Sequence, residues 1–213
     1  MERIRRALSS PVARAGYSLP MLSLRRPNEA AIRALIDRRG GEPYSYAEVG
    51  ATRGLTPPGY TEDRYRVKLG EGEAVFERAV AAVRRWEMFR LGWVEIVTPG
   101  APAPIAAGSL AAVLVRALGL WSLNLCRIVY VVEEDLSPMR RFGFAYGTLA
   151  EHAERGEERF MVEHNEEDGS VHYDILAFSQ PNELLARAAY PYTRSMQRRF
   201  GASSMRAMTA ACA

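Results

Sequence analysis

The chain has 213 residues, enough for one well-formed hydrophobic core and too few to suggest two large domains. Its apolar fraction of 48% and charged fraction of 25% are ordinary for a globular protein, which excludes wholesale disorder and fibrous classes. Lys68 is the single lysine among 28 basic residues, and the formal net charge is +3. We attribute the excess of arginine to codon usage in a GC-rich bacterial genome, although arginine also suits phosphate contacts. A nucleic-acid partner is therefore the less favoured interpretation.

Cys126 and Cys212 are the only cysteines, one in a strand-like run and one next to last, so we expect two free thiols in a reducing cytoplasm. The arginines of the first 20 residues leave an organellar transit peptide as an alternative. The most apolar stretch, 101–115, contains prolines and is shorter than the roughly 20 apolar residues of a membrane-spanning helix, so we expect no membrane span. Neither a cofactor nor a metal is expected.

The N-terminal quarter is predicted to hold one helix. Residues 1–24 have no convincing periodicity and are expected to form an irregular arm. A helix is predicted over 27–39, with Pro27 suited to its first turn and glycines after its end. The Gly-, Pro- and Tyr-rich stretch 43–59 is expected to be an ordered loop.

From residue 60 the pattern alternates between apolar and charged residues as far as residue 69, which predicts a strand with one solvated face. Helical spacing follows Gly72, and Gly92 is expected to end that helix. Asp168-Gly169 is a strong hairpin signal. A closing helix is predicted over about 182–208, kinked at Pro191. Six further strands are predicted, at 93–97, 105–115, 123–132, 142–149, 157–164 and 171–178.

This order of elements predicts an α+β fold. Since no crossover helices separate the later strands, they are expected to pair antiparallel. A sheet of six to seven strands curls, and its concave face must be covered. The closing helix is the one element long enough to cover it. The sequence therefore predicts one helix-grip domain over 25–213, a curved antiparallel sheet gripped by a long C-terminal helix. The hollow of such a fold commonly holds an apolar ligand.

Four segments carry a resemblance to a known family. They read YAEVGAT at 46–52, RFGFAYGTLAEHAERGEERF at 141–160, AFSQP at 177–181 and QRRF at 197–200. In them the chain resembles the DUF1990 family, an uncharacterised domain of unknown function of bacteria and plants, and the likeness extends from about 27 to 208. That family is grouped with the START and Bet v 1-like superfamily. The resemblance implies a helix-grip fold and supplies no catalytic residues.

Glu158 is the first candidate for a functional residue. On an alternating strand it shares a face with Phe160 and Val162. If these two point into the core, so does the carboxylate, which then needs a partner or a raised pKa. Alternatively, Glu158 lies exposed at the start of the strand or pairs with an arginine such as Arg127.

Other candidate groups have weaker support. His152, Glu154 and Glu157 are close in sequence, but their spacing matches no metal-site template, so we expect a solvated charged turn. His164 and His172 lie on opposite arms of the predicted hairpin, where a pair of histidines would suit proton transfer, although a structural role is favoured.

The run FGFAYG at 142–147 alternates large and small residues, so its small face leaves room for a helix or a ligand.

Three functions fit this sequence, which specifies neither the ligand, nor a reaction, nor the oligomeric state. The leading hypothesis is non-catalytic binding of a small, mostly apolar molecule between the sheet and the closing helix. A cyclase- or hydrolase-like enzyme that uses Glu158 for proton transfer in the same cavity is an alternative. The third is an interaction module that uses the basic closing helix, although the acidic stretch 151–168 is expected to neutralise it. The residues expected to contact the ligand are Glu158, Tyr146, Arg127, Tyr192, Phe160 and Trp86, and the basic residues of the helix are Arg187, Arg194, Arg198, Arg199 and Arg206.

Overall fold

The computed structural model describes residues 21–98, 104–150, 152, 154–181 and 190–213. Its centre is one antiparallel sheet with the strand order β2-β8-β7-β6-β5-β4-β3, and a short strand, β1, pairs with β5 beside this path. The strands are β1 (Met21–Ser23), β2 (Thr61–Glu71), β3 (Val94–Val97), β4 (Leu110–Ala117), β5 (Leu120–Leu136), β6 (Met139–Thr148), β7 (Glu154–Asn165) and β8 (Ser170–Pro181). The helices are α1 (Glu29–Arg39), α2 (Glu73–Arg84) and α4 (Tyr190–Cys212), with short 3-10 helices η1 (Ala51–Arg53) and η2 (Glu87–Phe89).

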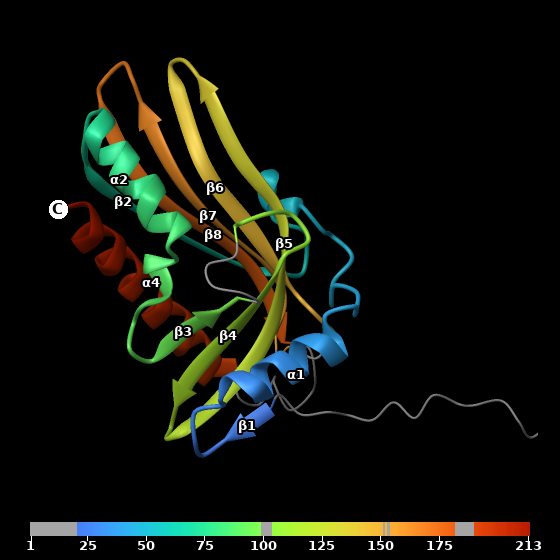
Figure 1. Ribbon diagram of the computed structural model, residues 1–213. Coiled ribbons are helices and arrows are strands. Elements are labelled where there is room, and N and C mark those ends of the chain that lie inside the picture. The colour runs from blue at the N-terminus through green and yellow to red at the C-terminus, as the bar shows by residue number, and fades with distance from the viewer. Residues whose placement is uncertain (1–20, 99–103, 151, 153, 182–189) are drawn as a thin grey trace, which may run out of the picture.

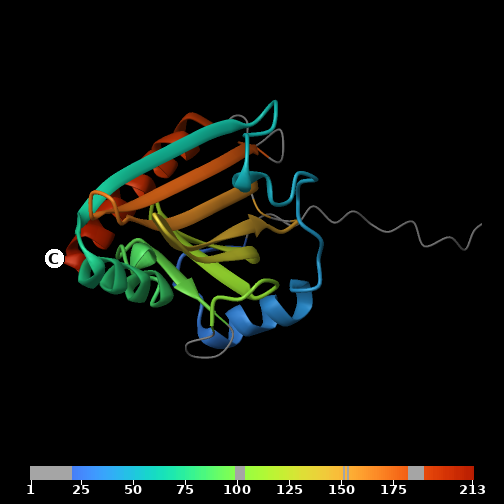
Figure 2. The same ribbon diagram turned by 90° about the horizontal axis from the view of Figure 1, so that it is seen from above.

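The helices cover both faces of the sheet. Figure 1 shows α2 and α4 along one face and α1 on the other, and Figure 2 shows the twist of the strands from above. Alternation along β4 explains the division. Ala111 and Val113 join the core under α2 and α4, whereas Ala112 and Leu114 join a second cluster with α1. The predicted antiparallel sheet with a C-terminal helix packed on it, the helix-grip arrangement, is confirmed.

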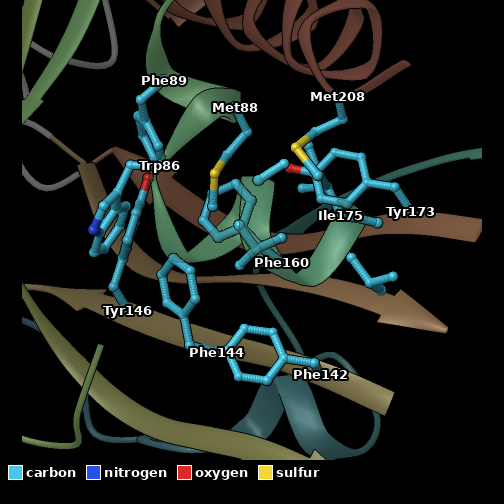
Figure 3. Close-up of a cluster of buried hydrophobic side chains, with 14 of the residues drawn as sticks. Trp86, Met88, Phe89, Phe142, Phe144, Tyr146, Phe160, Tyr173, Ile175 and Met208 are labelled. Carbon is cyan, nitrogen blue, oxygen red and sulfur yellow. The ribbon is translucent and has the colours of Figure 1, made fainter. Parts of the chain in front are cut away.

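The main core lies between α2, the second half of α4 and the middle of the sheet. Figure 3 shows Phe142, Phe144 and Tyr146 of β6 with Phe160 of β7, close to the side chains of Trp86, Met88 and Phe89. Met208 reaches this cluster from α4. Aromatic rings dominate the cluster, and Phe144 and Phe160 lie 5.3 Å apart between ring centroids, within the range of favourable ring pairs.

The end of α2 differs from its prediction. The helical pattern in the sequence continues to Gly92, but the helix ends at Arg84. Trp86 then adopts a left-handed backbone conformation with φ of 59°, which is uncommon for a large side chain, and η2 follows. The indole stays buried against Phe144, with 4.7 Å between ring centroids. Packing of the indole in the core therefore offsets the strain of the left-handed backbone conformation that follows the end of the helix.

The two ends of the chain also depart from expectation. Residues 21–23 form β1 and pair with β5, so the expected irregular arm does not extend through residue 24, while residues 1–20 lie outside the described part. The closing helix continues to Cys212, beyond the expected end at residue 208. Residues 182–189, which were expected to be helical, lie outside the described residues. The kink at Pro191 therefore stays a prediction.

The predicted loop 43–59 is ordered and packs on the α1 side of the sheet. Glu157 of β7, only 2% exposed, anchors it through four hydrogen bonds. Tyr46 Oη and the Gly50 backbone N–H donate to Oε2 at 2.7 Å each. The Thr52 backbone N–H donates to Oε1 at 3.1 Å, and the Thr52 hydroxyl donates to the same oxygen. One carboxylate thus satisfies the donors of a loop that has little regular structure of its own.

Candidate functional site

A cavity of ≈ 320 Å³ lies between the sheet and the first turns of α4. It occupies the end of the hollow away from α2, whose side chains fill the other end. Its lining has an apolar wall and a polar edge. The apolar wall includes Phe89, Trp93, Val113, Val115, Met196 and Phe200, and the polar edge includes Asp63, Asn124, Tyr146, Glu154, Glu158 and Gln197.

The strand register places four of the lining residues in one row across the sheet. Tyr146 of β6 pairs with Glu158 of β7, Glu158 pairs with Ala177 of β8, and Ala177 pairs with Asp63 of β2. All four line the cavity. Ala177 projects only a methyl group between two carboxylates, so the row leaves open space above the sheet at its centre.

Glu158 points into this cavity, as its alternation with Phe160 predicted. Its Oε2 accepts a hydrogen bond of 2.7 Å from Tyr146 Oη. Burial raises the pKa of Glu158 to about 7, the Tyr146 hydrogen bond opposes that rise, and the negative charge of Asp63 adds to it. At neutral pH the carboxyl group therefore exchanges between its protonated and ionised forms, as general acids and bases require.

Asp63 forms an ion pair with the helix that closes the cavity. Arg194 of α4 donates from Nη2 to Asp63 Oδ1 at 2.6 Å and from Nη1 to Oδ2, a bidentate arrangement. The same Nη1 donates to Gln197 Oε1 at 2.7 Å. This pair fixes the first turns of α4 above β2. It also neutralises one of the lining carboxylates.

Glu154 and His152 complete the polar edge. Burial raises the pKa of Glu154, and the Gln197 side chain donates to its Oε2 at 3.4 Å. His152 Nδ1 accepts from the Glu154 backbone N–H at 3.1 Å. Burial lowers the pKa of His152 to about 4, so its imidazole is neutral at pH 7. The charged groups on the cavity lining are thus all carboxylates.

The structure brings together three of the six predicted contact residues. Glu158 and Tyr146 form a hydrogen-bonded pair on the lining, and Tyr192 lies at the rim of the cavity, 41% exposed. Phe160 and Trp86 are core residues that do not line the cavity. Their side chains pack beneath it, against Phe144 and Phe89.

Arg127 was misplaced by the prediction. Its guanidinium lies on the α1 side of the sheet, where it donates to the carbonyl oxygens of Gly40 and Glu42 at 2.6 and 2.7 Å. The reason is that successive side chains of a strand point to opposite faces of the sheet. Cys126 belongs to the core on the cavity side, so the next residue of β5 points the other way. Arg127 is therefore a partner neither of Glu158 nor of the cavity.

Other predicted groups are separated by the sheet. His164 pairs in register with Val171, and His172 with Glu163, so the two histidines lie on opposite faces and form no pair. Tyr44 and Tyr46 fill the space beside Gly147 that the small residues of 142–147 leave, so neither a helix nor a ligand occupies it. No group of three or more metal-binding side chains occurs within the described ranges.

Three of the basic residues of α4 have intramolecular partners, and Arg198 is exposed. Arg194 is paired with Asp63, which lies outside the acidic stretch 151–168 expected to neutralise the helix. The guanidinium of Arg199 lies over the ring of Trp93, and Arg206 donates to Ser203 Oγ. Arg187 lies outside the described residues. None of the helices that the structure describes combines the length and apolar character needed to cross a membrane.

Sequence reasoning missed Asp63, Glu154 and Trp93 on the lining. Asp63 had a usable signal, because in the predicted strand 60–69 it shares a face with the apolar residues Tyr65 and Val67. Glu154 precedes the predicted strand, and its burial depends on the extension of β7 to that residue. Trp93 lines the cavity but was not among the six residues expected to contact the ligand.

Together the sheet, the gripping helix and the hollow between them define an α+β helix-grip protein with a cavity. The chain belongs to the family described as "Domain of unknown function (DUF1990)", whose model matches residues 45–207. A "UPF0548 protein" of Dictyostelium discoideum is 33% identical over 205 residues, 88% of this chain and 94% of its own. One of Deinococcus radiodurans is 39% identical over 196 residues, 87% and 92% of the two chains. The Dictyostelium relative extends the family beyond bacteria and plants.

Solved structures of low sequence identity are also similar. A hypothetical protein of Helicobacter pylori, jhp0584, aligns with a TM-score of 0.49 and 14% identity over 75% of this chain and 95% of its own. Ara h 8.0201 aligns with a TM-score of 0.46 and 9% identity, over 72% and 98%. Human STARD10 aligns with a TM-score of 0.43 and 12% identity, over 88% and 80%.

Proposed function

We propose that this protein binds a small, mostly apolar molecule in the cavity between the sheet and α4. The observation that carries the proposal is the cavity itself, ≈ 320 Å³ beside a fully packed core. Protein interiors are close-packed, so a hollow of this size between a sheet and the helix that covers it is larger than a packing defect. Its volume is at the lower end of the range for small-molecule sites, which points to a ligand of about a dozen non-hydrogen atoms.

The composition of the lining supports an apolar ligand with one polar end. Rings of Phe89, Trp93 and Phe200 offer flat apolar surface on one side. Tyr146 and Glu158 offer hydrogen-bonding groups on the same lining. A mostly apolar wall with a few convergent polar groups is the usual form of a site that both holds and orients a small molecule.

A variant that fills the cavity tests this proposal. In Val115→Trp the added indole occupies the hollow, so binding of octanol, measured by isothermal titration calorimetry, should fall at least about tenfold, equivalent to 1.4 kcal/mol. Val49→Trp is the matched control. Because Val49 is 43% exposed on the loop 43–59, this substitution should leave binding unchanged. Circular dichroism establishes that both variants fold. If Val115→Trp perturbs folding, Ala177→Met fills the same hollow from β8.

Two results would contradict the binding function. One is equal binding of octanol to the wild type and to a folded, cavity-filled variant. The other is the absence of any co-purifying small molecule in denaturing extracts together with no octanol binding at all.

An enzyme that uses the same cavity is the second candidate, and the geometry of Glu158 favours it. The carboxyl group borders the hollow, is hydrogen-bonded to Tyr146, and has a pKa of about 7, which suits proton transfer at neutral pH. Glu158→Gln retains the shape and removes the titration. Untargeted mass spectrometry of cell extract incubated with each protein should show a product with the wild type alone. Identical profiles for the two proteins would leave binding as the function.

A further inference from the structure

The charges on the cavity lining are unbalanced, and this imbalance restricts the class of ligand. Asp63, Glu154 and Glu158 are the acidic side chains that project into the hollow. Arg194 compensates Asp63 through its bidentate pair. No arginine or lysine side chain lies on the lining, and among the described residues no ion pair involves Glu154 or Glu158.

The two carboxyl groups of Glu154 and Glu158 offer hydrogen-bond acceptors to the hollow. Glu158 Oε2 already accepts from Tyr146, and within the described part of the chain no donor reaches Oε1. Glu154 Oε2 has a long contact of 3.4 Å from Gln197 Nε2, at the limit of a hydrogen bond. His152 uses Nδ1 as an acceptor. An incoming donor therefore has carboxyl oxygens of Glu154 and Glu158 as acceptors.

Electrostatics then separates the possible head groups. A carboxylate or phosphate in this hollow would lie beside two carboxyl groups that form no ion pair among the described residues, and their ionised forms would repel it. A protonated amine would supply the missing positive charge and donate hydrogen bonds to the free oxygens. A neutral alcohol lies between these two cases, since it can donate one hydrogen bond without a charge.

We propose that the ligand of the cavity is an amphipathic amine, with its ammonium group at the Glu154–Glu158 edge and its apolar body against the aromatic wall. This inference rests on the proposed binding function and assigns the chemical class of the ligand. The small side chain of Ala177 leaves the space beside Glu158 into which the ammonium group fits. Phe89, Trp93 and Phe200 receive the apolar part.

Three probes with one alkyl chain and different head groups test the assignment. Octylamine, octanol and octanoate are titrated into the full-length protein at pH 7 by isothermal titration calorimetry. We expect octylamine to bind at least about tenfold more tightly than octanol, and octanoate to bind about tenfold more weakly than octanol, each step equivalent to 1.4 kcal/mol. The cavity-filled Val115→Trp should bind all three weakly, which separates the cavity from non-specific adsorption.

The acceptors are tested by charge-neutral variants. Glu154→Gln and Glu158→Gln should each reduce the amine-to-alcohol ratio by about threefold, and the double variant should bring it near one, because only the charged head group gains from the carboxylates. Glu163→Gln is the control, since Glu163 lies on the same strand but on the opposite face, where Arg66 and Arg141 pair with it.

The outcomes distinguish the inference from the binding function. Equal affinities of octylamine and octanol for the wild type, or a ratio that survives in the double variant, would overturn the amine assignment and leave the binding function intact. Tighter binding of octanoate would reverse the assignment. If none of the three probes binds, both proposals fail. The wild-type ratio alone decides the inference should the double variant not fold.

Discussion

Substitution of Glu157 tests how much its hydrogen bonds to the loop 43–59 contribute to stability. The carboxylate is 2% exposed and accepts from Tyr46 Oη, from the backbone N–H groups of Gly50 and Thr52, and from the Thr52 hydroxyl. In Glu157→Gln one oxygen becomes an amide nitrogen. The two hydroxyl groups can rotate to accept from that nitrogen, but a backbone N–H beside it is left without an acceptor.

The expected loss of stability follows from these bonds. A buried donor left unpaired costs about 1–3 kcal/mol, and hydrogen bonds to a charged group are worth about 1.5–3 kcal/mol each. One orphaned N–H and three weakened bonds therefore predict a loss of about 3 kcal/mol in the free energy of unfolding. For a chain of this size that corresponds to a fall of roughly 6–12 °C in the melting temperature.

Urea and thermal unfolding, followed by circular dichroism, measure the effect. Glu163→Gln is the matched control on the same face of β7, because Glu163 also has side-chain partners but is half-buried and loses only ion pairs with Arg66 and Arg141. We expect it to cost about 1 kcal/mol or less. Equal losses in the two variants would refute the claim that Glu157 anchors the loop. Amide exchange at Gly50 and Thr52 should accelerate in Glu157→Gln alone.

Three further predictions concern titration, turn geometry and close packing. The pKa of Glu158 is about 7 in the folded protein and 4.5 ordinarily, so the folded state retains a proton that the unfolded chain has lost, and stability should fall as the pH rises from about 4.5 to 7. The lowered pKa of His152, about 4, makes stability rise with pH up to about pH 6.5. The difference in stability between the wild type and Glu158→Gln therefore isolates the effect of Glu158. Parallel curves of stability against pH for the two proteins would disprove its titration. Leu118, 83% exposed, and Gly119 both have positive φ in the β4–β5 turn. Since asparagine adopts positive φ more readily than leucine, Leu118→Asn should raise the free energy of unfolding in urea by about 0.5–1 kcal/mol. A loss of stability would contradict this account of the turn. Gly147→Ala would place its Cβ against Tyr46 Oη and should cost at least about 2 kcal/mol, whereas Gly41→Ala, with open space beside it, should change little; similar effects at both positions would show that the contact is not tight.

Much of the fold was predictable because it follows from local periodicity. The alternation of β2 and the Asp168-Gly169 turn signal were sufficient for those elements, and the antiparallel pairing of the later strands followed from the absence of crossover helices. The end of α2 was not predictable, because the pattern continues through Trp86 and only the packing of its indole in the core explains the break. β1 was missed because three residues carry no periodicity, and its pairing with β5 is long-range.

The site was predictable only where parity within one strand was enough. Glu158 and Tyr146 each lie on a strand with an unambiguous apolar face, and both were placed correctly on the cavity side. Arg127 was placed wrongly because residues 123, 125 and 127 of β5 share a face, and Leu123 and Leu125 show that this face is buried against α1 and not against the cavity. The ion pair between Asp63 and Arg194 joins elements 131 residues apart, a distance over which local sequence carries no information.

Glu157 and Glu158 are neighbours whose side chains leave β7 in opposite directions. A slip of this strand by one position would exchange the two glutamates and leave the donors of Tyr46, Gly50 and Thr52 facing the wrong side chain. The loop 43–59 on the α1 side of the sheet thus favours the observed register of β7. Because it holds Glu157 on the α1 side, Glu158 is the carboxyl group that borders the cavity.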